Sequence, residues 1–418
     1  MARIPIARMS ARVLLAPAVA ALFIQPPSPA RADAVTDWNV IAVSATAVPP
    51  NSILQSRVLA IVHGAIYDAV RAVEQKGAAY AVDLKAPQGT SINAAVATAA
   101  HGVLVRLAPA QRPTLDITLN AALAKITDGQ AKTDGIRTGS EVADKIVLLR
   151  SSDQSDAKVT FMPRPGPGLY QLTPPDFAPA ILPQWGGVTP FGLRSRSGLE
   201  FKGPPAITSA EFARDFDEVK NVGARNSTTR TADQTAAAIF WVAQTGVPWF
   251  AAARAHATAK KLSTADNARL FAMLAMATAD SQIIGFDEKY KRLHWRPVTA
   301  IRAAADLNIP TLKGDPNWEP LIVTPPQPDY PSTHCIFSGA AEAVLRGFFG
   351  SDDINVSVTF PVPLGVTRTY RKFSEMAQEV ENARVWGGIH FRTADRDGSN
   401  VGRKIGTMVM RDFPKPGN

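Results

Sequence analysis

Three short segments between residues 289 and 395 hold the side chains whose types and spacing could do chemistry. They supply three permanent cations, two imidazoles and a Ser-Thr pair. Arginine presents a planar, two-pronged donor that matches a tetrahedral oxyanion, and the first turn of a helix offers N–H groups to the same ligand. The combination predicts an oxyanion-binding site. The three blocks, numbered in chain order, are Lys289 to Pro297, Pro331-Ser332-Thr333-His334, and Arg384 to His390.

Helices are expected to position these blocks. Residues 335–345 have the pattern of a helix, so Ser332 and Thr333 stand where that helix begins and where its dipole favours an anion. Lys289 and Arg296 are seven residues apart, close to two helical turns, and both are expected on one face of a helix that Pro297 then bends.

The blocks resemble the signature of the superfamily that joins PAP2 (phosphatidic-acid-type) phosphatases to vanadium-dependent haloperoxidases. That signature is Lys, six residues, Arg-Pro; then Pro-Ser-Gly-His; then Ser-Arg, five residues, His, three residues, Asp. Six residues separate Lys289 from Arg296, and five separate Arg384 from His390. The chain departs from the signature at three positions: Thr333 stands in place of Gly, Ala383 in place of Ser, and Ala394 in place of Asp, with Asp395 one residue late.

The resemblance implies a role for each matched residue. In the phosphatases the counterpart of His390 forms a phospho-histidine, and in the haloperoxidases it binds vanadium as the axial ligand. His334 would be the acid–base residue on the opposite side of the ligand. Either Asp395 or Asp397 is a candidate for orienting His390. Vanadate, the implied cofactor, would be held by Lys289, Arg296, Ser332, Thr333, Arg384 and His390.

The leading hypothesis is an exported haloperoxidase that uses hydrogen peroxide to oxidise a halide at a bound vanadate. The segment His334-x-x-x-Ser338-Gly339-Ala340 and the long helical half before the blocks favour this branch. One alternative is a periplasmic acid phosphatase that acts on small phosphomonoesters through phospho-His390 and needs no vanadate. A second is a non-catalytic oxyanion-binding protein. The sequence leaves the halide, the organic acceptor and the oligomeric state open.

Composition predicts an all-α fold. Hydrophobic residues make up 46% of the 418, and aromatic residues only 7%. We expect helical bundles of the haloperoxidase/PAP2 type, with an N-terminal helical half over 33–153 and a C-terminal half over 208–418 that carries the site. Residues 154–207, rich in Pro and Gly but also in aromatic residues, are expected to form an ordered connecting strap.

Apolar spacing predicts helices at 52–74, 91–107, 110–127, 130–150 and 264–293. Asn51 or Ser52 is the expected cap of the first. Capping boxes are expected at Thr208 with Glu211 and at Thr231 with Gln234.

The first 32 residues read as a secretory signal peptide. Arg3, Arg8 and Arg12 precede an apolar run, and Ala30-Arg31-Ala32 is a small-x-small cleavage site. Because the leader contains four Arg and no acidic residue, cleavage after Ala32 changes the net charge from +9 to +5 (9 − 4). We therefore expect a secreted or periplasmic protein with no membrane span after cleavage, small-molecule substrates and no nucleic-acid partner. The single Cys335 is expected to be a buried thiol.

Overall fold

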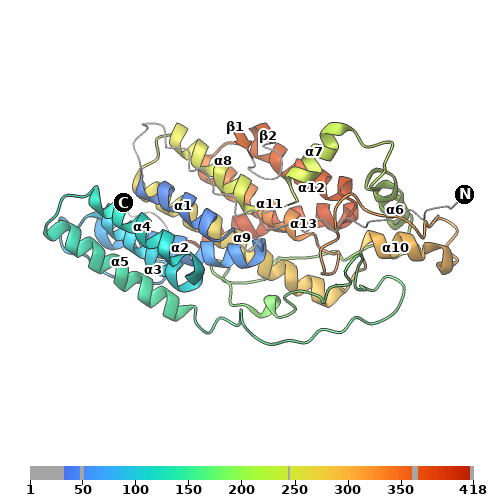
Figure 1. The fold of residues 1–418 in the computed structure, drawn as a ribbon, viewed down its shortest axis with the longest axis horizontal. Coiled ribbons are helices and arrows are strands. Elements are labelled where there is room, and N and C mark those ends of the chain that lie inside the picture. The colour runs from blue at the N-terminus through green and yellow to red at the C-terminus, as the bar shows by residue number, and fades with distance from the viewer. Residues whose placement is uncertain (1–32, 48–50, 243–244, 360–365, 415–418) are drawn as a thin grey trace, which may run out of the picture. The chain divides into compact units, whose positions relative to one another are not determined.

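Helix α9 (Thr264–Arg292) runs between two groups of helices in the computed structural model (Figure 1). The structure describes residues 33–47, 51–242, 245–359 and 366–414, so the predicted signal peptide lies outside the described residues. Residues 33–418 form one compact unit. Within it α9 contacts α2 of the N-terminal region and α11 and α13 of the C-terminal region.

The N-terminal region follows the predicted helices closely. Asn51 caps α2, its side chain accepting hydrogen bonds from the N–H groups of Ile53 and Leu54. The segment predicted at 110–127 divides into a 3-10 turn, Pro109–Gln111, and a helix, while the helix at 34–45 was not predicted. The helices are α1 (Ala34–Ala45), α2 (Ser52–Glu74), α3 (Ile92–Leu107), α4 (Arg112–Ala124) and α5 (Gln130–Leu149).

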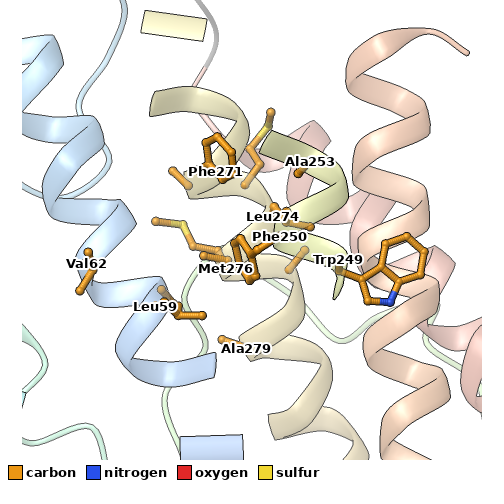
Figure 2. Close-up of a cluster of buried hydrophobic side chains, with 14 of the residues drawn as sticks. Leu59, Val62, Trp249, Phe250, Ala253, Phe271, Leu274, Met276 and Ala279 are labelled. Atoms are coloured by element: carbon orange, nitrogen blue, oxygen red, sulfur yellow. The ribbon is translucent and has the colours of Figure 1, made fainter. Parts of the chain in front are cut away.

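Helix α2 is the one described helix that is by itself long and apolar enough to cross a membrane. Of its most apolar stretch, 83% is buried inside the protein. Figure 2 shows the reason: Leu59 and Val62 of α2 lie in the same apolar cluster as Phe271, Leu274 and Met276 of α9. Its apolar character is thus explained by its place in the core.

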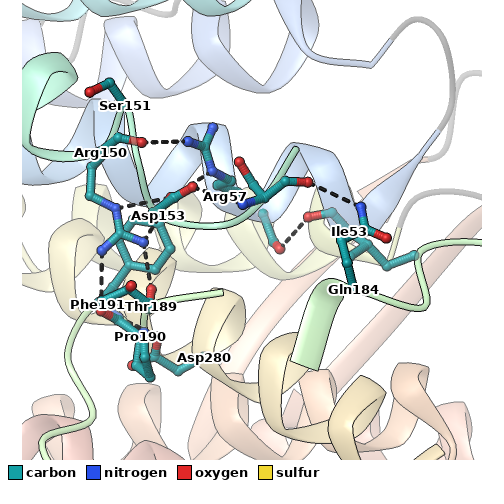
Figure 3. Close-up of polar contacts among 12 residues, drawn as sticks. Ile53, Arg57, Arg150, Ser151, Asp153, Gln184, Thr189, Pro190, Phe191 and Asp280 are labelled. Carbon is teal, nitrogen blue, oxygen red and sulfur yellow. Dashed lines mark hydrogen bonds and ion pairs between the residues drawn. The ribbon is translucent and has the colours of Figure 1, made fainter. Parts of the chain in front are cut away.

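Residues 154–207 follow an irregular path whose one regular element is the 3-10 turn Trp185–Gly187. Asp153, at the start, accepts hydrogen bonds from Arg57 Nε (2.8 Å) and Arg150 Nη2 (3.0 Å). Arg150 also donates to the carbonyl of Thr189 (2.5 Å), which ties the strap to α5 and α2 (Figure 3). Trp185, in the 3-10 turn Trp185–Gly187, is buried.

The C-terminal region holds the remaining helices. The capping box of Thr231 and Gln234 is present, whereas Thr208 forms none: Ser209 is the cap instead, one residue later, and accepts from Phe212 N–H. The helices are α6 (Ala210–Val222), α7 (Ala232–Phe240), α8 (Gly246–Ala259), α10 (Pro297–Ala303), α11 (Thr333–Phe349), α12 (Phe373–Trp386) and α13 (Arg392–Asp412), with a 3-10 turn at Ala304–Leu307.

A two-stranded antiparallel hairpin corrects the all-α prediction. Strand β1 (Asp353–Thr359) pairs with β2 (Thr367–Lys372), with Val356 opposite Tyr370. Ile354, Val356 and Val358 are buried and alternate with exposed polar residues, which is the two-residue period of a strand. The fold is therefore predominantly helical with one small sheet.

Glycines let α11 and α13 approach closely, and this contact fixes the blocks that these helices carry. A Cβ at Gly402 would lie 2.1 Å from the Ile336 carbonyl oxygen, and one at Gly339 would lie 2.3 Å from the Ser399 carbonyl oxygen. No residue with a side chain fits at either position without a backbone shift.

Candidate active site

The first block follows the end of α9 instead of continuing it. Leu293 adopts the left-handed conformation (φ 52°), and its N–H donates to the Lys289 carbonyl. The chain then turns, so that Arg296 becomes the residue before α10. The prediction that Lys289 and Arg296 share one helical face is wrong, because the helix ends between them. They approach the site from a helix end and from a loop.

The second block begins α11, as predicted. Ser332 is the N-cap residue, and its backbone N–H donates to the carbonyl of Ala394 (3.0 Å). A Cβ at Gly398 would lie 2.8 Å from the Ser332 carbonyl oxygen, so α13 passes directly against this helix start. Thr333 is buried, and its carbonyl accepts from Gln282 of α9 (3.0 Å).

The third block joins α12 to α13 through a tight turn. Gly388 has φ +77°, and a Cβ there would lie 2.4 Å from the Gly223 carbonyl oxygen. Arg384, in the last turn of α12, donates to the Trp241 carbonyl (2.8 Å). The turn brings His390 back beside the first block, where Arg296 Nη1 lies 2.9 Å from its Nε2. All seven predicted site residues thus lie in one buried region.

Three buried cations give the site an excess of positive charge. Lys289 Nζ donates to the carbonyls of Pro328 (2.5 Å) and Asp329 (2.9 Å), and Arg296 Nε donates to that of Gln327 (2.7 Å). Burial, together with the charge of Arg296, lowers the pKa of Lys289 well below its ordinary value. Burial lowers the pKa of Arg384 to about 10. A bound anion would relieve this cost of burying positive charge.

His390 is held by a carboxylate that the sequence signature did not point to. Oδ1 of Asp329 lies 2.8 Å from Nδ1 of His390, and its Oδ2 lies 3.5 Å from Nδ1 of His294. Burial would raise the pKa of Asp329, but the two imidazoles and Arg296 outweigh it and hold the pKa below its usual range. Burial, then Arg296, lowers the pKa of His390 well below the ordinary value, although the Asp329 carboxylate acts in the opposite direction.

The two carboxylates that the signature suggested contact other groups. Asp397 accepts a hydrogen bond from the hydroxyl of Tyr330 (2.9 Å). Asp395 Oδ1 lies 3.2 Å from the thiol of Cys335, which is buried as predicted. Burial raises the pKa of both Asp395 and Cys335 well above their ordinary values, although the Ser332 hydroxyl acts in the opposite direction. A carboxyl with a raised pKa is more easily neutralised, so Asp395 offsets less of the positive charge of the three cations.

His334 lies in the first turn of α11, close to the cations. Burial and the charges of Arg384, His390 and Lys289 lower its pKa well below the ordinary value. Its Nε2 is buried and has no hydrogen-bond partner among the described residues. A neutral imidazole with a spare nitrogen can accept or return a proton of a ligand bound beside it.

The residues present fit a tetrahedral oxyanion such as vanadate. Besides His334 Nε2, the buried atoms Arg296 Nη2 and Arg384 Nε find no hydrogen-bond partner in the described part of the chain. Buried polar atoms without partners are uncommon in folded proteins, and two of these are N–H donors on permanent cations. The oxygens of a vanadate or phosphate ion would accept from them.

A second group of arginines, at the far end of α11 and α13, has no such spare donors. It lines a surface groove of about 520 Å³. Glu342, buried in that groove, pairs with Arg346 (2.8 Å) and with Arg403 (2.8 Å). None of the block residues lines this groove.

Comparisons with known proteins agree with the predominantly helical fold. The family model described as the VCPO second helical-bundle domain matches residues 269–415, which include all three blocks. Vanadium chloroperoxidase of Curvularia inaequalis is 26% identical over 381 residues, covering 71% of this chain. The chain spans only 61% of the length of that relative.

Solved structures match nearly the whole chain. A bacterial vanadium-dependent iodoperoxidase gives a TM-score of 0.76 at 26% identity, covering 91% of this chain and 95% of the other. The holo form of a bacterial vanadium-dependent chloroperoxidase gives 0.70 at 16% identity, covering 93% and 94%, which shows a common fold. The chain therefore has the fold of bacterial vanadium-dependent haloperoxidases, and its residues 269–415 match a domain of the family that the three blocks resemble.

Proposed function

We propose that the chain is a vanadate-dependent haloperoxidase that oxidises halide with hydrogen peroxide. The observation that carries the proposal is that His390 lies 2.9 Å from Arg296, while Arg296 Nη2 and Arg384 Nε are buried donors without a partner in the described part of the chain. The balanced reaction takes hydrogen peroxide, halide and one proton to hypohalous acid and water. The relatives' names, a chloroperoxidase and an iodoperoxidase, support the reaction class.

Each site residue has a task in this proposal. Lys289, Arg296 and Arg384 hold the oxyanion by charge and N–H donation, and the N-terminal end of α11 adds its dipole. Nε2 of His390 would hold the oxyanion through its lone pair. When bound, vanadate supplies a Lewis-acidic centre that activates peroxide. His334 moves the proton that the reaction needs, because its spare Nε2 lies beside the same cations.

The paired assay that tests the proposal uses purified protein with and without added orthovanadate. One arm follows peroxide-dependent bromination of a dye, and the other follows phosphate release from a generic phosphomonoester. Bromination that requires vanadate supports the haloperoxidase. Phosphate release that vanadate merely inhibits would replace it with a phosphatase acting through His390, and activity in neither arm would favour a non-catalytic oxyanion-binding protein.

We propose further that residues 1–32 direct export and are removed after Ala32. The supporting features are the three leader arginines before an apolar run and the small residues at the cleavage site. N-terminal sequencing of the protein recovered from the periplasm or medium tests this. A mature chain that begins at Asp33 is expected, and an intact leader on a cytoplasmic protein would contradict it.

A further inference from the structure

Asp329 lies outside the three blocks, yet it is fixed to the first of them from two sides. Its backbone N–H donates to the His294 carbonyl (2.8 Å), and its own carbonyl accepts from Lys289 Nζ (2.9 Å). The residue is fully buried. Its side chain therefore has a defined position.

The carboxylate of Asp329 faces two imidazoles. Oδ1 is 2.8 Å from His390 Nδ1, and Oδ2 is 3.5 Å from His294 Nδ1. Arg296 Nη1 lies 2.9 Å from Nε2 and 3.4 Å from Nδ1 of the same ring, and it also donates to the Ile389 carbonyl (2.7 Å). The 2.8 Å approach of a carboxylate oxygen to Nδ1 favours a proton on that nitrogen, which leaves the lone pair on Nε2.

We propose that Asp329 is the positioning residue for His390. It holds the ring orientation and the Nδ1–H tautomer, so that Nε2 offers its lone pair to an oxyanion that can form a coordinate bond, and His294 steadies the second carboxylate oxygen. This inference rests on the proposed function. It also explains why Ala394 is tolerated four residues after His390, where the signature has the aspartate that orients this histidine.

If Asp329 acted through its charge alone, removing the carboxylate would strengthen anion binding, whereas loss of a positioning residue would weaken vanadate binding. Loss of a negative charge beside Lys289 and Arg296 should strengthen the binding of any anion. Loss of a positioning residue should weaken vanadate, which forms a bond to nitrogen, and should spare phosphate, which is held by charge and hydrogen bonds. The ratio of the two affinities therefore separates a positioning role from a merely structural or electrostatic one.

The experiment titrates orthovanadate and inorganic phosphate into the wild type, Asp329→Ala and Asp329→Asn by calorimetry. For Asp329→Ala the vanadate Kd is expected to rise about 10- to 100-fold, the usual effect of losing such a partner, while the phosphate Kd stays level or falls. Asp329→Asn keeps a carbonyl acceptor and should recover part of the loss, although it removes the same charge. Asp397→Asn, which removes a charge from a residue bonded to Tyr330, should change neither Kd. Parallel changes for both anions, or equal effects of Ala and Asn, would overturn the proposal.

A second readout uses the full-length protein with no ligand added. Nitrogen-15 NMR of the His390 ring should report a proton on Nδ1 in the wild type and a mixture of tautomers in Asp329→Ala. A wild-type ring protonated on Nε2 would refute the assignment even if the variants fail to fold. Because this measurement needs no turnover, a protein that fails the bromination assay but shows the Nδ1–H form loses the proposed function and keeps this inference.

Discussion

Helix α9 buries two charges in opposite ways. Asp280, in its middle, accepts hydrogen bonds from the backbone N–H groups of residues 191–193, at 2.6, 2.8 and 2.6 Å. Lys289, nine residues later, lies among other cations. Both carboxylate oxygens of Asp280 accept hydrogen bonds from the strap, whereas buried donors near Lys289 have no partner among the described residues.

These unpartnered donors are Arg296 Nη2 and Arg384 Nε, which find no acceptor among the described residues. Asp68 repeats the saturated pattern, because it accepts from the N–H groups of residues 80–82. The number of hydrogen-bond partners inside the chain therefore distinguishes a buried structural charge from a buried ligand-binding charge. A structural charge has all its hydrogen bonds inside the chain, and a ligand-binding charge does not.

The largest effect on activity is expected from His334→Ala, beside the unpartnered cations. Bromination should fall about 10²- to 10⁴-fold, because general acid–base catalysis contributes that much. Vanadate affinity should change only modestly, since the three cations remain. Steady-state kinetics and a vanadate titration measure the two quantities. His101→Ala, a histidine of α3 that pairs with Asp116, is the matched control and should retain full activity.

Asp280→Ala should destabilise the protein by about 3 kcal/mol, because it leaves three buried N–H groups without an acceptor. Chemical denaturation measures this change. Asp156→Ala, at an exposed residue of the strap, serves as the control and should leave the unfolding midpoint where it is. Equal midpoints for Asp280→Ala and the wild type would mean that the strap does not depend on this carboxylate.

A smaller effect on the free energy of unfolding is expected from a change of pH. Burial raises the pKa of Asp280 to about 6, from 3.8, despite its three hydrogen bonds. Because the folded pKa is the higher one, this group's contribution to stability is complete below pH 3.8 and is lost as pH rises through about 6. A shift of about two units corresponds to about 3 kcal/mol at most. Between pH 4 and 7 the wild type should therefore lose more unfolding free energy than Asp280→Asn, and a wild type that gains relative to the variant would reverse the sign.

Sequence reasoning predicted the long helices well, because they depend on local pattern, and the structure brings the seven block residues into one region, while their roles stay a prediction. The apolar spacing and the Asn51 cap predicted α2 with its observed ends. The pattern could not reveal that Leu293 would end α9 in the left-handed conformation, a state that its residue type does not favour. That Lys289 lies on α9 while Arg296 lies in the loop after it is therefore a consequence of tertiary contacts.

Asp329 was missed for a different reason. It lies three residues before Ser332, where the signature specifies nothing, and its partners His294 and His390 are 35 and 61 residues away in the chain (329 − 294 and 390 − 329). Only the fold brings them together. The available signal was the missing aspartate at Ala394, which left His390 without its expected partner. The hairpin at 353–372 could have been found from the alternation of Ile354, Val356 and Val358.

Equilibrium dialysis with orthovanadate measures whether the unpartnered cations bind a ligand and the fully hydrogen-bonded charges do not. The wild type should bind one vanadate per chain, in competition with phosphate. Arg384→Ala should weaken binding about tenfold or more, since it removes charged hydrogen-bond donors. Arg346→Ala, whose guanidinium is already paired with Glu342, should bind as the wild type does. No saturable binding, or equal losses in the two variants, would contradict the account.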